Sequence, residues 1–127
     1  MVLIEDIAYD IMDSIRDSLT PELLKPEYVD DNKENPMFGH CYISSEALYY
    51  KLKEYHKTRF KAVCGKDDEG ITHWWIVDTQ TGRRFDVTAD QYYSIGKTPP
   101  YENGTITGFL TNKPSKRCQV LLNKMES

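Results

Sequence analysis

The sequence predicts an α+β fold, because segments with helical periodicity and segments with strand composition occupy separate parts of the chain. Apolar residues recur at helical spacing in residues 2–19 and again in residues 41–55. Residues 71–78 and 83–88 are rich in β-branched and aromatic side chains, which favour strands. The four residues between these two strands have the composition of a turn. We therefore expect the two strands to form an antiparallel β-hairpin.

Composition and charge limit the classes of function. The chain has 127 residues, 39% hydrophobic and 28% charged, which is ordinary for a globular protein with one domain over residues 1–127. The net charge of −4 argues against nonspecific nucleic-acid binding, which needs a basic face. No apolar run approaches the ~20 residues that span a bilayer, and the N-terminal residues do not have the pattern of a secretion signal. We expect a cytoplasmic protein that binds neither nucleic acid nor membrane, with its oligomeric state left open.

The first helix is expected to be amphipathic and to pack on the core through one apolar stripe, with acidic residues on its remaining surface. The stripe consists of Leu3, Ile4, Ile7, Ile11, Ile15 and Leu19. Thr20 and Pro21 predict a short second helix, because threonine is a good N-cap and proline fits the first helical position. Residues 28–35 are polar and acidic and should form a loop.

The second half of the chain supplies the strands. Alternating side chains in residues 60–65 predict a strand before the hairpin. Residues 89–93 predict a short turn or helical segment, and residues 96–108 predict irregular structure because they contain prolines and glycines. Ser115 should cap the last helix. The expected inner face of that helix consists of Val120, Leu121 and Met125.

Cys41 is the first candidate for a reactive residue. Pro36 and Gly39 disfavour a helix start before His40, so Cys41 should lie in the first turn of its helix. The positive end of a helix stabilises a thiolate, which is the nucleophilic form of cysteine. A lone cysteine is more often a small buried apolar residue, so the rest of the chain must supply its partners. The expected buried face of this helix consists of Ala47, Leu48, Leu52 and Tyr55.

The register of the hairpin decides whether His73 and Asp86 can meet. A loop of four residues places Trp75 opposite Asp86. His73 is two residues from Trp75, so it shares the same face and lies diagonal to Asp86. Diagonal neighbours are roughly 7–8 Å apart at Cα, within reach of an imidazole and a carboxylate. In this register Asp78, the competing acid, falls on the other face.

These residues have the types that a nucleophile, a base and an orienting acid require. His73 would take the proton of Cys41, and Asp86 would hold the imidazole in the right tautomer. The backbone N–H of Cys41 would be one oxyanion donor. The chemistry that fits is a cysteine hydrolase or acyltransferase acting on an amide, isopeptide or thioester bond, and it requires no cofactor.

The order of these residues resembles the transglutaminase-like branch of the papain-like cysteine enzymes. That signature is a cysteine at a helix start, then a histidine beside an aromatic, here His73-Trp74-Trp75, then an aspartate followed by x-Thr, here Asp86-Val87-Thr88. The resemblance implies a papain/transglutaminase-like α+β fold, in which the nucleophile helix packs on a small antiparallel β-sheet.

A wider set of strings, including Gly39-His40-Cys41 and Gly108-Phe109-Leu110-Thr111, resembles the small YunG-like proteins of phages and bacteria. That resemblance covers roughly residues 36–120 and implies no particular substrate. The chain departs from papain in lacking a glutamine before the cysteine as an oxyanion donor, so that His40 or Asn35 would have to substitute.

The substrate, an unknown protein, peptide or small acyl compound, would lie against the residues around this constellation. The expected wall residues are His40, Tyr42, Trp74, Trp75 and Gln91. Ordinary core packing is the competing interpretation, and we expect it for at least one of the tryptophans.

Two other functions remain open. The first is a non-catalytic protein-binding module on the same scaffold, such as a phage factor that occupies a host protein. The second is a metal site built from His40, Cys41, His73 and Asp86, but this spacing matches no recognised zinc pattern, so no metal is expected. Cys64 and Cys118 are expected to be structural and unpaired, because an odd number of widely spaced cysteines does not suggest a disulfide framework.

Overall fold

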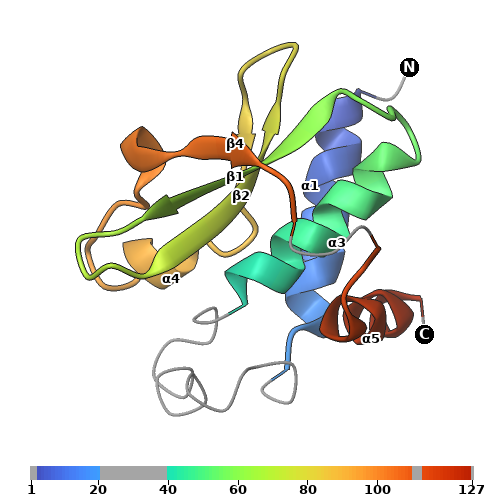
Figure 1. Cartoon of the computed structure of the whole chain (residues 1–127). Coiled ribbons are helices and arrows are strands. Elements are labelled where there is room, and N and C mark those ends of the chain that lie inside the picture. Colours follow the sequence, from blue (N-terminus) through green and yellow to red (C-terminus); the bar gives the residue numbers. More distant parts are fainter. Residues whose placement is uncertain (1–2, 21–39, 110–112, 127) are drawn as a thin grey trace.

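The computed structural model describes residues 3–20, 40–109 and 113–126. Figure 1 shows its helices and strands in chain order. The helices are α1 (Ile4–Ser18), α3 (Cys41–Lys53), α4 (Asp90–Tyr93), the 3-10 helix η3 (Tyr101–Asn103) and α5 (Lys116–Met125). The strands are β1 (Phe60–Lys66), β2 (Thr72–Asp78), β3 (Arg84–Phe85) and β4 (Thr105–Thr107). The α+β class predicted from the sequence is confirmed.

The strands form one antiparallel sheet in the order β3-β2-β1-β4. In the β2–β3 hairpin, Ile76 pairs with Phe85 and Val77 with Arg84, which is the register expected from a four-residue loop. Gly82 has a φ of +76°, a conformation that glycine adopts without strain and that closes this loop. Because β3 has only two residues, the chain leaves the sheet just before Asp86.

Helices α1, α3 and α5 gather on one side of the sheet (Figure 1). One face of the strands, represented by Phe60, Ile76 and Phe85, packs against them in a continuous apolar core. Side chains alternate along a strand, so His73 and Trp75 point to the opposite face from Trp74 and Ile76. The candidate base therefore lies on the face of the sheet that is turned away from the helical core.

The prediction that Ser115 caps the last helix is confirmed. The Oγ of Ser115 accepts the backbone N–H of Cys118 at 3.2 Å at the start of α5. The predicted inner face of α5 was partly wrong: Leu121 is buried as expected, but Cys118 is buried beside it and Val120 is 45% exposed. Val120 follows Cys118 by two positions, so it points about 200° around the helix from it.

Two other faces were also assigned partly wrongly. In α1 the fully buried residues are Ala8, Met12 and Ile15, whereas Leu3 is 54% exposed. Ile4, Ile11 and Leu19 of the expected stripe are partly buried against the same core. After α3, Tyr55 is 56% exposed, because the helix ends at Lys53 and the chain turns away from the core.

Strand β4 was not expected within residues 96–108, which were predicted to be irregular. It pairs with β1 through Val63 and Ile106 and forms the edge of the sheet. The predicted second helix at Pro21 and the predicted loop at 28–35 lie outside the described residues. Among the helices that are described, none is both long and apolar enough to cross a membrane.

Candidate active site

His73 and Asp86 form a buried pair on the outer face of the hairpin. The Nε2 atom of His73 is 2.6 Å from the Oδ2 atom of Asp86. His73 is 0% exposed and Asp86 is 7% exposed, so water does not screen this contact. The diagonal register places both residues on one face, and the end of β3 frees the Asp86 backbone to turn its carboxylate toward the imidazole.

Two further donors hold the Asp86 carboxylate. The hydroxyl of Tyr101 donates to Oδ2 at 3.0 Å, and the backbone N–H of Thr88 donates to Oδ1 at 3.2 Å. Both oxygens are therefore occupied, and the carboxylate has a fixed orientation toward His73.

Cys41 is the first residue of α3, and His40 is its N-cap. The Cys41 thiol is 9% exposed as a residue and donates to the carbonyl oxygen of Thr72 at 3.7 Å. Thr72 directly precedes His73, so the thiol lies at the start of β2 beside the candidate base. The helix start and the histidine strand thus meet, as the sequence argument required.

The charge state of His73 reflects these neighbours. Burial lowers its pKa, but the hydrogen bond to Asp86, with a smaller contribution from the Cys41 thiol, outweighs burial and raises the pKa to about 9. The second ring nitrogen, Nδ1, is buried and has no hydrogen-bond partner among the described residues. At neutral pH the imidazole is therefore mainly charged, with Nε2 bound to Asp86 and with Nδ1 as a buried N–H that has no acceptor among the described residues.

His40 is a second buried histidine with the opposite electrostatics. It is 1% exposed, and its Nδ1 atom has no hydrogen-bond partner within the described part of the chain. Burial lowers its pKa from 6.5 to about 4, and no carboxylate of the described residues offsets that effect. His40 is thus a neutral side chain at neutral pH, next to Cys41 at the start of α3.

The expected wall residues divide between two faces of the sheet. Trp74 is on the helical side, in edge contact with Tyr42 and stacked on Phe109, with ring centroids 4.9 and 5.6 Å apart. Trp75 is 2% exposed on the other side and packs against the rings of His73 and Tyr101. Adjacent residues of a strand cannot line one wall, so Trp75 is a core residue behind His73. Gln91 is buried on α4, beside Tyr92.

Tyr101 and Tyr92 belong to the site and were not singled out from the sequence. The Tyr92 ring meets the His73 ring edge-on at 4.9 Å, and its hydroxyl donates to Asp67 at 2.8 Å. Both tyrosines come from the region after the hairpin, where prolines and glycines obscure the pattern. The one feature of the sequence that could have pointed to them is its high tyrosine content, nine residues.

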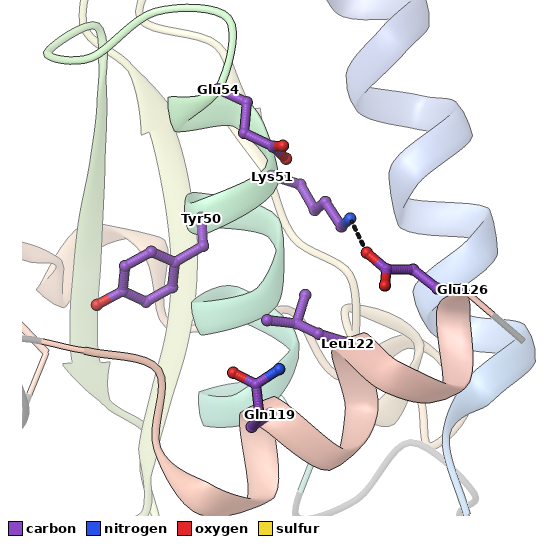
Figure 2. A pocket seen from close by; sticks show the side chains of 6 residues that line it. All are labelled: Tyr50, Lys51, Glu54, Gln119, Leu122 and Glu126. Atoms are coloured by element: carbon purple, nitrogen blue, oxygen red, sulfur yellow. Dashed lines mark hydrogen bonds and ion pairs between the residues drawn. The ribbon is translucent and has the colours of Figure 1, made fainter.

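Two pockets lined by described residues lie away from Cys41 and His73. Figure 2 shows the first, of about 200 Å³, between α3 and the C-terminal helix, where Lys51 and Glu126 form an ion pair at 3.1 Å. The second, of about 310 Å³, lies behind Tyr92 and is lined mainly by charged and polar residues of the 67–68 turn and of residues 97–103.

No group of three or more histidine, cysteine, aspartate or glutamate side chains is arranged to hold a metal ion in residues 3–20, 40–109 and 113–126. Cys41, Cys64 and Cys118 are all free thiols, which confirms the prediction that Cys64 and Cys118 are unpaired. Burial raises the pKa of the Cys118 thiol to about 12, helped by the nearby Glu46 carboxylate. Cys118 is therefore an inert core residue.

Comparison of the chain with models of known protein families, with curated proteins and with solved structures found no match. The candidate site therefore depends on the geometry of Cys41, His73 and Asp86.

Proposed function

We propose that this protein is a cysteine hydrolase or acyltransferase acting on an amide, isopeptide or thioester bond, with Cys41 as nucleophile. The observation that carries the proposal is the state of His73. One ring nitrogen of this fully buried residue is bound to Asp86 at 2.6 Å, and the other has no partner among the described residues. An unpaired buried polar atom is costly, so an Nδ1 atom without a partner beside the Cys41 thiol fits proton transfer better than a purely structural role.

The chemistry follows from these positions. Transfer of the Cys41 proton to Nδ1 of His73 gives a thiolate and an imidazolium, which is the charged form that the raised pKa of His73 favours, and the thiolate attacks the acyl carbon of the substrate. The protonated imidazole then donates that proton to the departing amine or thiolate, which leaves a thioester on Cys41. Water or an amine attacks the thioester, His73 takes the proton of the attacking group, and Cys41 is restored as a thiol.

The start of α3 supports the negative charge in this scheme. The first N–H groups of an α-helix have no partner within the helix, and the helix dipole is positive there. In this proposal the backbone N–H of Cys41, in the first turn of α3, donates to the oxyanion of the tetrahedral intermediate. Neutral His40 is buried beside it, its Nδ1 atom has no partner among the described residues, and we propose it as a second polar group at this end of the helix.

We also propose that the fold is a small papain/transglutaminase-like fold, as the resemblance to YunG-like proteins implies. The support is the order of elements: a helix that begins with the cysteine, packed on an antiparallel sheet whose neighbouring strands bring the histidine and the aspartate together. The parts of that resemblance that fall on residues 36–39 and 110–112 lie outside the described residues.

An activated ester tests the proposed reaction without a known substrate. With p-nitrophenyl acetate, the wild type should release about one equivalent of p-nitrophenolate per protein in a burst, followed by slow turnover. The acetyl group should map to Cys41. Cys41→Ala should abolish the burst, and Cys64→Ala, which removes a thiol on the opposite face of the sheet from His73, should retain it.

The same assay separates the binding-module alternative from the enzyme. In a non-catalytic module the cysteines would be acetylated slowly and without a burst. The rate of acetylation at each cysteine would depend only on the exposure of its thiol. Addition of a primary amine distinguishes acyl transfer from hydrolysis, because an acyltransferase would form the acetylated amine faster than acetate.

A further inference from the structure

Tyr101 contacts the same oxygen of Asp86 that His73 contacts. Its hydroxyl is 3.0 Å from Oδ2, and the Nε2 atom of His73 is 2.6 Å from that atom. Tyr101 comes from η3, which is 15 residues beyond Asp86 in the chain. A separate element of the fold therefore delivers a donor to the oxygen on which the basicity of His73 depends.

The Tyr101 ring is held in place by neighbours on both sides. The Trp75 ring meets it edge-on at 5.2 Å, and the guanidinium of Arg84 lies 4.2 Å above its centroid. These contacts fix the direction of the hydroxyl. Burial, and then the negative charge of Asp86, raise the pKa of Tyr101, so its hydroxyl keeps its proton and donates.

We propose that Tyr101 is a positioning residue that limits how tightly Asp86 holds the proton of His73. The inference rests on the proposed function. Two donors on one carboxylate oxygen compete for the same negative charge, so each hydrogen bond is weaker in the presence of the other. Donation from Tyr101 is strongest when His73 is neutral and weaker when the imidazole is charged. The hydroxyl thereby favours the neutral, proton-accepting form of His73.

The other charged and titratable groups around this pair are few in the described residues. Cys41 from α3 and Tyr92 from α4 contact His73 itself, and Tyr93 lies beside the Tyr101 hydroxyl. Arg84 faces the Tyr101 ring. Among these groups only Tyr101 shares an oxygen of Asp86 with His73, so a change at its hydroxyl acts directly on that bond.

Tyr101→Phe removes the hydroxyl and keeps the ring between Trp75 and Arg84. The pKa of His73, followed by NMR of labelled imidazole, should rise by roughly 0.5 pH units, if about a third of the free energy of a charged hydrogen bond depends on the state of His73. The acidic limb of ester turnover against pH should move up by the same amount, since deacylation is the slow step and His73 must be neutral to take the proton of water.

Tyr92→Phe is the matched control. The Tyr92 ring contacts His73 at 4.9 Å, but its hydroxyl donates to Asp67 and not to Asp86. The control should lose stability and leave the pKa of His73 unchanged. If Tyr101→Phe does not fold, 3-fluorotyrosine at position 101, a stronger donor of the same shape, should lower the pKa of His73 instead.

Two results would overturn the inference. An unchanged pKa of His73 in Tyr101→Phe, with a lower melting temperature, would mean that the hydroxyl is structural only. A change of the same size in Tyr92→Phe would mean that the effect is not specific to the Asp86 oxygen. A wild type without an ester burst would instead contradict the proposed function, and the NMR titration would still decide the role of Tyr101.

Discussion

Replacing Asp86 by asparagine should change His73 from a mainly charged to a mainly neutral side chain at neutral pH. The structure contains its own reference for the size of the effect. His40 and His73 are buried to the same extent, at 1% and 0% exposure, but within the described part of the chain only His73 has a carboxylate partner. The pKa is about 4 for His40 and about 9 for His73. The difference corresponds to about 7 kcal/mol between the two protonation states, as an upper limit.

Cys41 supplies part of that difference, so the loss of Asp86 alone should move the pKa of His73 by less than the full amount. Burial then dominates, and we expect the pKa of His73 in Asp86→Asn to fall below its ordinary value of 6.5. The amide also faces three donors with one acceptor oxygen, which should cost about 2–4 kcal/mol of stability.

The dependence of stability on pH gives a second readout with a defined sign. The folded-state pKa of His73 is raised, so its contribution to stability is fully present below pH 6.5 and is lost as the pH rises to about 9. Asp86→Asn should remove this alkaline loss. The measurements are urea unfolding between pH 6 and 9.5 and the NMR titration of His73.

Asp78→Asn is the control for general destabilisation. Asp78 is a fully buried carboxylate on the same hairpin, but it points to the other face and binds Arg59 through both oxygens, at 2.9 and 2.8 Å. It should lose stability without changing the titration of His73. Equal titration of His73 in the wild type and in Asp86→Asn would refute the reasoning.

Three further changes test other parts of the structure. Since the folded-state pKa of His40 is lowered to about 4, the wild type should lose stability as the pH falls below 6.5, and His40→Gln should recover about 2 kcal/mol at pH 5 in urea unfolding. Glu46→Gln should cost about 1–3 kcal/mol and increase hydrogen exchange in α5, because buried Glu46 accepts both the N–H and the hydroxyl of Ser115 at 2.7 Å. Gly104→Ala should lower the melting temperature, at a cost of about 1–3 kcal/mol, because a Cβ there would be 2.6 Å from the Trp75 ring.

The hairpin could be predicted from the sequence because its determinants are local. The aromatic strand, the loop that ends in Gly82 and the period of two together fix which residues face one another. Those rules were enough to predict the register in which Ile76 pairs with Phe85 and to bring His73 within reach of the Asp86 carboxylate. The helix start at Cys41 was equally local, since glycine and proline precede it.

The remaining contacts depend on packing between segments far apart in the chain. Glu46 would be expected on the solvent face of a helix, but it is 0% exposed. Its carboxylate binds Ser115, the N-cap residue of α5, which lies 69 residues further along the chain. β4 has only three residues, too few for a strand pattern, and pairs with β1 across more than 40 residues of sequence. Tyr101 reaches Asp86 only because η3 folds back over the hairpin.

The rate of Cys41 alkylation against pH tests the central claim most directly. Cys64 in the same molecule is the internal reference, because burial raises the pKa of its thiol and no histidine contact acts on it in the described residues. With iodoacetamide and peptide mapping, Cys41 should react faster than Cys64 at pH 6–7, with a rate that changes little up to pH 8. The rate at Cys64 should rise about tenfold per pH unit, as for a thiol below its pKa. A rate at Cys41 that rises in parallel with that of Cys64 would contradict activation by His73.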